Sequence, residues 1–347
     1  MAVNQRTELE KYMETGLEKG ATEVLLVPGE PAGFRVRGIL QRESGEPLTS
    51  RQVTEIASAA LGEDDLKRIG REVGELRARC SLGEKAEGRM CVAKSMGEYT
   101  VAIRIFPREI PHARSIGIPD ALLEAALGEP GLIIVAGPTG SGKTTTLIAL
   151  AEYIGNNKSC HICTVEDPVH YVLRVEKAIV QQREVGIDVP DTVGGIMASL
   201  RQDPDVLVVT EVRNAEEVKA CFDAMENGCM VLVQMHGVSK GAAIQRLMDL
   251  HPEEKIDVCQ RRLAESLRAA SVQILLPKVT GEGRVAAYGL LIPDKATRVA
   301  IAEGYGVLEM VMPEVEGCRT LVEDIGRLFR EGIISAETRD KALRELE

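Results

Sequence analysis

The residues Gly137-Pro138-Thr139-Gly140-Ser141-Gly142-Lys143-Thr144 match the phosphate-binding loop pattern G-x-x-x-x-G-K-[ST] at every fixed position. Glycines allow backbone N–H groups to close around phosphates, and a helix that begins here adds its positive N-terminal end. The pattern predicts that Lys143 holds the β- and γ-phosphates of a nucleoside triphosphate and that the Thr144 hydroxyl binds Mg²⁺. The next residue, Thr145, is also expected to bind the nucleotide.

Titratable residues directly follow three other apolar runs of the chain. These are Glu166 after residues 160–165, Glu211 and Arg213 after residues 206–210, and His236 after residues 230–235. Because the carboxyl ends of parallel strands meet at one edge of a sheet, we expect these side chains close to the phosphate loop, with strand 206–210 directly beside the strand of that loop. Glu211 is expected to bind Mg²⁺ through water and to orient the water that attacks the γ-phosphorus.

Each of these residues also has a purely structural interpretation. Glu211 could be a solvated residue at a helix start, and Glu166 could cap a turn that contains proline. His236 could form hydrogen bonds without taking part in chemistry, since a single histidine is weak evidence of a site. The sequence leaves both interpretations open.

A predicted β-hairpin around Gly97 would place two arginines on paired strands. If residues 89–94 and 99–106 pair around the four-residue loop Ser95 to Glu98, Arg89 lies directly opposite Arg104. Like charges in that position are unfavourable unless an anion lies between them or water solvates them well. The first possibility is an arginine pair that serves a nucleotide, in which case an N-terminal domain could offer it to the site of a neighbouring subunit. Solvation on an open face is the alternative.

The elements that position these residues fall into two groups. Residues 1–107 show helical spacing at 4–19 and 49–61, the latter with Ser50 as N-cap, and strand patterns at 24–27 and 34–40, so we expect a small α+β domain. Residues 108–119 are expected to be a linker. In residues 120–347 apolar runs alternate with helical patterns, which predicts an α/β domain with a parallel sheet. Its expected strands are 132–136, 160–165, 206–210, 230–235, 271–276 and 285–292; its expected helices include 144–154 and, in the C-terminal part at about 294–347, 294–303, 320–331 and 335–345.

Composition narrows the class of protein. The chain has 347 residues, of which 44% are hydrophobic, and a formal charge of −11, which argues against a general coat for nucleic acid. The N-terminal residues lack the apolar core of a signal peptide, and no apolar run reaches the length of a membrane span, so we expect a cytoplasmic protein. The eight cysteines are expected to be small core residues, with a redox or metal role for Cys160 and Cys163 as the alternative.

These motifs together resemble the secretion-ATPase superfamily of type II secretion and type IV pili, most closely its pilus-retraction, or twitching-motility, branch. Besides the phosphate loop, the resemblance is carried by Thr164-Val165-Glu166-Asp167-Pro168, Gln182-Arg183-Glu184-Val185, Leu200-Arg201-Gln202-Asp203-Pro204-Asp205, Thr210-Glu211-Val212-Arg213 and His236. It covers nearly the whole chain. The retraction branch is favoured because the chain is short and lacks the four-cysteine metal insert of the extension branch.

The resemblance implies a P-loop NTPase with a RecA-like domain after a PAS-like N-terminal domain, assembled as a homohexamer. ATP and Mg²⁺ would bind between the domains and at the subunit interface. Glu166 and Glu211 correspond to the acidic-box and Walker B glutamates, His236 to the histidine box, and Arg89 with Arg104 to the N-terminal-domain arginines. The implied partner is a pilus platform protein of the inner membrane, where the motor would be peripheral, with a paralogous pilus ATPase as a further partner and no nucleic acid.

Several positions depart from the pattern of this superfamily, among them Cys91, Met96 and Gly237. The principal hypothesis is an ATP-hydrolysing motor for pilus retraction. The departures motivate an alternative, which is a nucleotide-binding accessory or regulatory paralogue that hydrolyses little by itself and co-assembles with an active motor. A DNA-translocating ATPase is a third hypothesis, against which the acidic composition argues.

Overall fold

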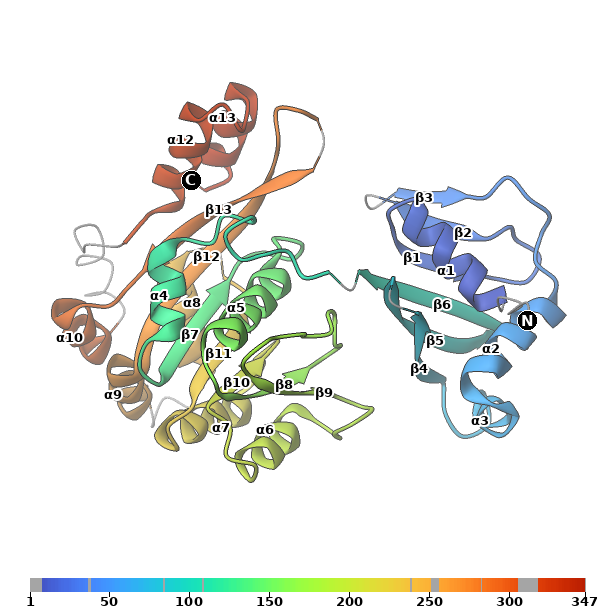
Figure 1. The fold of residues 1–347 in the computed structure, drawn as a ribbon, viewed down its shortest axis with the longest axis horizontal. Coiled ribbons are helices and arrows are strands. Elements are labelled where there is room, and N and C mark those ends of the chain that lie inside the picture. The colour runs from blue at the N-terminus through green and yellow to red at the C-terminus, as the bar shows by residue number, and fades with distance from the viewer. Residues whose placement is uncertain are drawn as a thin grey trace. The chain divides into compact units, whose positions relative to one another are not determined.

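The computed structural model describes residues 8–36, 39–83, 85–107, 109–237, 239–250, 256–281, 283–304 and 318–346. The chain divides into two compact units, Met1–Glu109 and Ile110–Glu347. Each unit has its own sheet with helices packed on it (Figure 1). No helix in these described ranges is both long and apolar enough to cross a membrane.

The first unit contains a six-stranded sheet in the order β3-β2-β1-β6-β5-β4. The strands are β1 (Ala21–Leu26), β2 (Gly33–Val36), β3 (Ile39–Arg42), β4 (Glu75–Leu82), β5 (Ala86–Ser95) and β6 (Glu98–Pro107), and the helices are α1 (Glu8–Glu18), α2 (Ser50–Leu61) and α3 (Glu63–Arg68). Buried and more exposed residues alternate along β5 because one face of the sheet packs against the helices. The other face carries polar and charged side chains.

Two details of this unit correct the sequence prediction. Thr49, not Ser50, is the N-cap of α2, since its hydroxyl accepts from the backbone N–H of Gln52 while the Gln52 side chain accepts from the Thr49 backbone. The single strand expected at 34–40 is two antiparallel strands, β2 and β3, paired from Val36 with Ile39.

The β5–β6 hairpin confirms the predicted register. Arg89 pairs with Arg104, and the pairing continues to Ser95 with Glu98. The connection is therefore a two-residue turn, Met96-Gly97, shorter than the predicted four-residue loop. Both turn residues have positive φ, 51° and 86°, as a type I′ turn requires.

The second unit contains a seven-stranded sheet in the order β13-β12-β7-β11-β10-β8-β9. The strands are β7 (Gly131–Ala136), β8 (His161–Glu166), β9 (Ile179–Glu184), β10 (Val206–Val209), β11 (Met230–Met235), β12 (Leu267–Pro277) and β13 (Arg284–Leu291). All neighbours are parallel except β12 and β13. The order contradicts the expectation that 206–210 lies beside the phosphate-loop strand, because β11 lies between β7 and β10. Strand β13 is antiparallel because a hairpin, not a crossover helix, connects it to β12.

Helices cover both faces of this second sheet (Figure 1). One face packs against α4 (Asp120–Leu127) and α5 (Lys143–Asn157). The other face packs against α6 (Thr192–Leu200), α7 (Ala215–Glu226), α8 (Lys240–Asp249), α9 (Ile256–Ser266), α10 (Lys295–Glu303), α12 (Leu321–Arg330) and α13 (Ala336–Arg344). Strand β7 is buried along its whole length, as expected for the centre of a parallel sheet. The segment 110–119 contributes Ala113 and Ile118 to the core of this unit.

Candidate active site

The phosphate loop connects the buried strand β7 to helix α5. Gly142, the N-cap of α5, has φ 86° and no side chain to cap the helix, so the first N–H groups of α5 have no capping partner. Gly137 has φ 154°, and a Cβ there would lie 2.4 Å from the Gln273 carbonyl oxygen. Only glycine fits at that position, because the loop passes directly against β12. The geometry is that of an anion-binding loop at a helix N-terminus.

The loop residues predicted from the sequence lie in one continuous structure. Gly137, Ser141 and Lys143 are buried, Pro138, Thr139 and Gly140 are exposed, and Gly142, Thr144 and Thr145 are half-buried. The loop is thus fixed at its two ends by buried residues, and its tip is exposed to solvent.

Lys143 is held inside the loop. Its Nζ donates to the backbone carbonyl of Pro138 at 2.9 Å, and only 5% of the residue is exposed. Burial lowers the pKa of Lys143, and the negative charge of Glu211 acts in the opposite direction. A phosphate would give the Lys143 ammonium group a negatively charged partner. Nucleotide binding would therefore replace the neutral Pro138 carbonyl with an anion.

Thr144 and Thr145 each have a polar partner from another element. The Thr144 hydroxyl donates to Gln234 Oε1 on β11 at 2.8 Å, and the Thr145 hydroxyl lies 3.3 Å from the Tyr171 hydroxyl. A hydroxyl that donates to Gln234 keeps its oxygen lone pairs available for a hard cation such as Mg²⁺. No group of three or more His, Cys, Asp or Glu side chains suited to a metal occurs in the described part of the chain. Mg²⁺ would thus need phosphate oxygens from the nucleotide to complete its coordination.

Glu211, Arg213 and His236 meet at the carboxyl edge of the sheet, as predicted. Arg213 donates to Glu211 at 2.6 Å and contacts Asp167 at 3.3 Å, and His236 Nε2 lies 3.4 Å from Glu211. Burial acts to raise the pKa of Glu211, but the hydrogen bond and charge of Arg213, with His236 and Lys143, outweigh it and hold that pKa below its ordinary value. The cationic surroundings therefore favour the ionised form of Glu211.

Glu166 is in a different environment from Glu211, although it comes from the same sheet edge. It is fully buried and accepts hydrogen bonds from the Thr164 hydroxyl at 2.6 Å and from Gln182 Nε2 at 2.8 Å. Glu184 pairs directly with it across β8 and β9. Burial, aided by the charge of Glu184, raises the pKa of Glu166 to about 7 against the opposing hydrogen bonds. In this conformation Glu166 is a buried group beneath the site, with its side chain among β8 and β9.

Arg89 and Arg104 belong to the first unit and lie on the face of its sheet that the helices leave uncovered. The two residues are paired across β5 and β6, with Arg79 of β4 directly beyond Arg89 and Glu23 of β1 directly beyond Arg104. Arg104 is exposed and Arg89 is half-buried. Three arginines thus form one row across neighbouring strands, where the sequence analysis had identified two.

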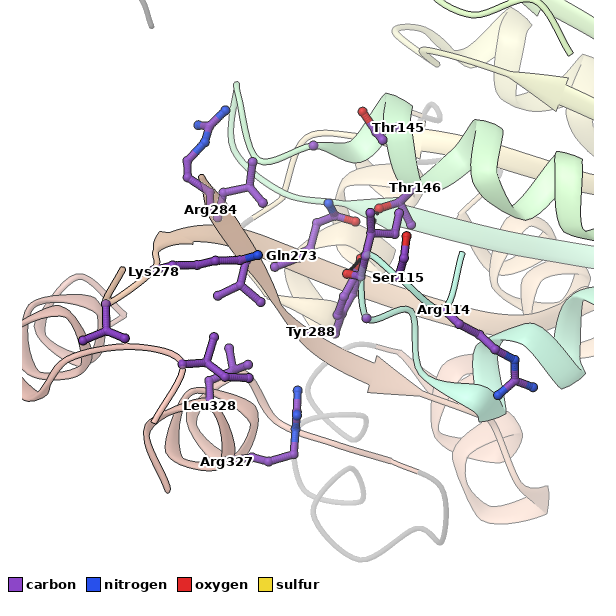
Figure 2. Close-up of a pocket in the computed structure, with 18 of the residues that line it drawn as sticks. Arg114, Ser115, Thr145, Thr146, Gln273, Lys278, Arg284, Tyr288, Arg327 and Leu328 are labelled. Atoms are coloured by element: carbon purple, nitrogen blue, oxygen red, sulfur yellow. Dashed lines mark hydrogen bonds between the residues drawn. The ribbon is translucent and has the colours of Figure 1, made fainter. Parts of the chain in front are cut away.

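A pocket of about 660 Å³ adjoins the phosphate loop within the second unit (Figure 2). It begins at Gly142 and Thr145 and extends along β12 and β13 to the end of α12. Tyr288 lies in its wall, where the hydroxyl contacts Thr146 and the backbone carbonyl of Ile116, each at 3.4 Å. Its other lining residues are Arg114, Ser115, Gly117, Gln273, Leu275, Lys278, Val279, Thr280, Arg284, Val285, Ala286, Arg327, Leu328, Gly332 and Ile333. This volume is typical of small-molecule sites.

Sequence reasoning missed several residues of the site. Gln234 and Gln273 contact the phosphate loop from β11 and β12, the two strands that flank β7. Neither follows a motif, and glutamine does not titrate, so only the strand order identifies them. Arg79 was missed because β4 was not predicted. Tyr288 was missed because an isolated tyrosine within an apolar strand gives no signal of a pocket.

Comparison with known proteins identifies the family. The sequence model of the family described as type II/IV secretion system protein matches residues 74–326. The chain is 34% identical over 296 residues to the uncharacterized protein YggR of Escherichia coli, which covers 85% of this chain and 89% of that protein. It is 30% identical over 340 residues to the type IV pilus retraction ATPase PilT of Pseudomonas aeruginosa, covering 96% of this chain and 98% of PilT.

Solved structures agree with the sequence relatives. The crystal structure of the pilus retraction motor PilT with bound ADP superposes with a TM-score of 0.85 at 33% identity, and 97% of each chain is covered. The predicted class, an α/β RecA-like P-loop domain, is thereby confirmed. The chain belongs to the type II/IV secretion system protein family, and it is a P-loop ATPase similar to the pilus retraction ATPases of that family.

Proposed function

We propose that this protein is an ATP-hydrolysing, homohexameric motor that powers type IV pilus retraction, acting in the cytoplasm at a platform protein of the inner membrane. The observation that carries the proposal is geometric: a phosphate loop with the buried Lys143 inside it follows β7, and the hydrogen-bonded group of Glu211, Arg213 and His236 lies at the same edge of the sheet. The similarity to PilT over almost the whole of both chains supports the same role.

In this proposal the site residues have distinct tasks. Lys143 leaves the Pro138 carbonyl and binds the β- and γ-phosphates, while Thr144, held by Gln234, takes part in binding Mg²⁺. Glu211, held by Arg213 and close to His236, orients the attacking water. Mg²⁺ supplies charge neutralisation at the phosphates when it is bound.

Glu166 and the arginines of the first unit complete the proposed machinery. Glu166 lies beneath the site as a neutral or partly ionised acid and would support charge changes there from a buried position. Arg89 and Arg104, with Arg79 in the same row, would bind phosphate oxygens of a nucleotide in a neighbouring subunit.

The alternative function is a nucleotide-binding accessory paralogue that co-assembles with an active pilus ATPase. The observation that favours it is the hairpin near the arginine row, where Cys91 and Met96 depart from the pattern that the superfamily resemblance implies. Such a protein would bind ATP through the same loop but release little product by itself.

One hydrolysis experiment separates the two functions. For the motor we expect Mg²⁺-dependent ATP turnover that disappears in Lys143→Ala and falls by about 100-fold or more in Glu211→Gln, because each variant removes charge placed at the reacting phosphate. Lys158→Ala is the matched control, since Lys158 also donates to a backbone carbonyl but at the opposite end of α5. Nucleotide binding without turnover in the wild type would favour the accessory function, and full activity in Lys143→Ala would refute the site assignment.

A further inference from the structure

Gln273 on β12 has one end fixed and one end free. Its Nε2 donates to the backbone carbonyl of Ser141 in the phosphate loop at 2.7 Å. A carbonyl oxygen can only accept, so this contact determines which end of the amide carries the nitrogen. The other end, Oε1, has no hydrogen-bond partner among the described residues, although only 1% of Gln273 is exposed. A buried acceptor without a donor is unfavourable, and its presence points to a ligand that supplies one.

The surroundings of Gln273 indicate which ligand that is. Gln273 lines the pocket that begins at Gly142 and Thr145, where the phosphate loop enters α5. Figure 2 shows Gln273 beside Thr146 and Tyr288, with Lys278 extending toward the same space. Phosphates bound to the N–H groups of the loop would leave the nucleoside half of the nucleotide to enter this pocket. The inference therefore rests on the proposed binding of ATP at the phosphate loop.

The charge of the pocket supports an anionic ligand with an uncharged end. Its lining includes Arg114, Lys278, Arg284 and Arg327 but no Asp or Glu among the described residues. Arg114 and Arg327 have carboxylate partners, whereas Lys278 and Arg284 form no ion pair within the described ranges. Those cations favour phosphate, but phosphate at neutral pH offers an acceptor little to bind. Of the parts of a nucleotide, the sugar and the base are the ones that carry donors for Gln273.

We propose that Gln273 is a specificity-determining residue whose Oε1 accepts a hydrogen bond from the nucleoside half of the bound nucleotide. The donors of that half are the ribose hydroxyls and the amino group of the base. The same amide then connects the nucleoside to the phosphate loop through Ser141, so that recognition of the correct nucleotide and the conformation of the loop are linked through one side chain.

The test compares ATP with analogues that each lack one donor. The full-length protein is titrated by calorimetry, in the presence of Mg²⁺, with ATP, 2′-deoxy-ATP, 3′-deoxy-ATP and the triphosphate of purine riboside, which has no amino group. We expect one analogue to bind about 10- to 100-fold more weakly than ATP, because it leaves Gln273 without its donor. The analogue that loses affinity identifies the sugar or the base as the source.

Variants separate recognition from a structural role of Gln273. In Gln273→Met, the affinity for ATP divided by the affinity for the weakly bound analogue is expected to fall to about one. This ratio of affinities is independent of any effect that loss of the Ser141 contact has on the binding of all nucleotides. Gln273→Glu keeps an acceptor and is expected to retain the ratio. Gln234→Met is the matched control, because Gln234 also holds the loop, through Thr144, but does not line the pocket; it should weaken all nucleotides alike and keep the ratio.

Equal affinity of the wild type for all four nucleotides would overturn the inference, as would an unchanged ratio in Gln273→Met. Both results leave the proposed ATPase intact. Absence of any ATP binding would instead contradict the proposed function itself, so the two failures are distinguishable. Should Gln273→Met not fold, Gln273→Leu takes its place, since it also removes the acceptor, and equal affinity of the wild type for all four nucleotides still overturns the inference.

Discussion

At the scale of single residues, two glutamates that follow neighbouring strands have opposite electrostatic environments. Glu211 has cationic partners and a lowered pKa, whereas Glu166 is surrounded by neutral donors and lies beside Glu184. The sequence predicted that both residues reach one edge of the sheet. It could not predict this difference, because the raised pKa of Glu166 comes chiefly from burial, and β9, which pairs with β8 beside Glu166, was not among the predicted strands.

The raised pKa of Glu166 makes stability depend on pH. The folded protein favours the neutral acid, so the favourable contribution of Glu166 is fully present below the unfolded pKa of about 4.5 and is lost as pH rises through about 7. Glu166→Gln keeps an acceptor for Thr164 and Gln182 but cannot ionise. We expect the variant to exceed the wild type in free energy of unfolding by roughly 1–3 kcal/mol at pH 8 and to approach it at pH 5.

Urea denaturation at pH 5 and pH 8 measures this difference. Glu124→Gln, at an exposed position on α4, controls for the general effect of removing one negative charge. A Glu166→Gln variant that is less stable than the wild type at pH 8 would show that the ionised carboxylate is favoured in the folded protein, contrary to this account.

At the scale of elements, patterned apolar runs predicted most of the second sheet, and the register of the β5–β6 hairpin followed from the spacing of its residues. Strands β4 and β9 were missed because each carries several charged or amide side chains, as edge strands often do. The position of β11 between β7 and β10 was also missed, since strand order is set by packing between distant segments. That order is what brings Gln234 and Gln273 to the loop.

The turn of the β5–β6 hairpin is strained at Met96. This fully exposed residue has φ 51°, a left-handed backbone conformation that is unfavourable for residues other than Gly, Asn and Asp. Met96→Asn is expected to raise the free energy of unfolding of the first unit by about 0.5–1 kcal/mol, and Met96→Val to lower it by a similar amount. Thermal unfolding followed by circular dichroism compares the two, and equal melting temperatures would count against a type I′ turn.

At the scale of the whole molecule, the two units carry complementary parts of the proposed machinery. The second unit holds the phosphate loop and Glu211, and the first unit holds the arginine row. The sequence predicted both sets of residues, but one chain does not show whether an arginine serves its own nucleotide or that of a neighbour. In the proposed ring, the arginines serve the nucleotide of a neighbouring subunit.

Mixing inactive variants tests that arrangement. Lys143→Ala lacks a working phosphate loop, and the double variant Arg89→Ala and Arg104→Ala lacks the arginine pair. If arginines act between subunits, mixed assemblies contain some sites with both parts intact, and ATP hydrolysis is expected to reappear when the two inactive proteins are co-assembled. Mixtures that stay as inactive as their components would place the arginines outside the neighbouring site.

The most direct test of the central claim is steady-state ATP hydrolysis by the purified full-length protein, measured together with its mass in solution and with Lys143→Ala as the blank. The account predicts Mg²⁺-dependent turnover that belongs to a particle of about six subunits and is lost on dilution to monomers. A particle of that size that binds ATP without hydrolysing it, or a monomer that is fully active alone, would contradict the claim that this chain is an assembled ATP-driven motor.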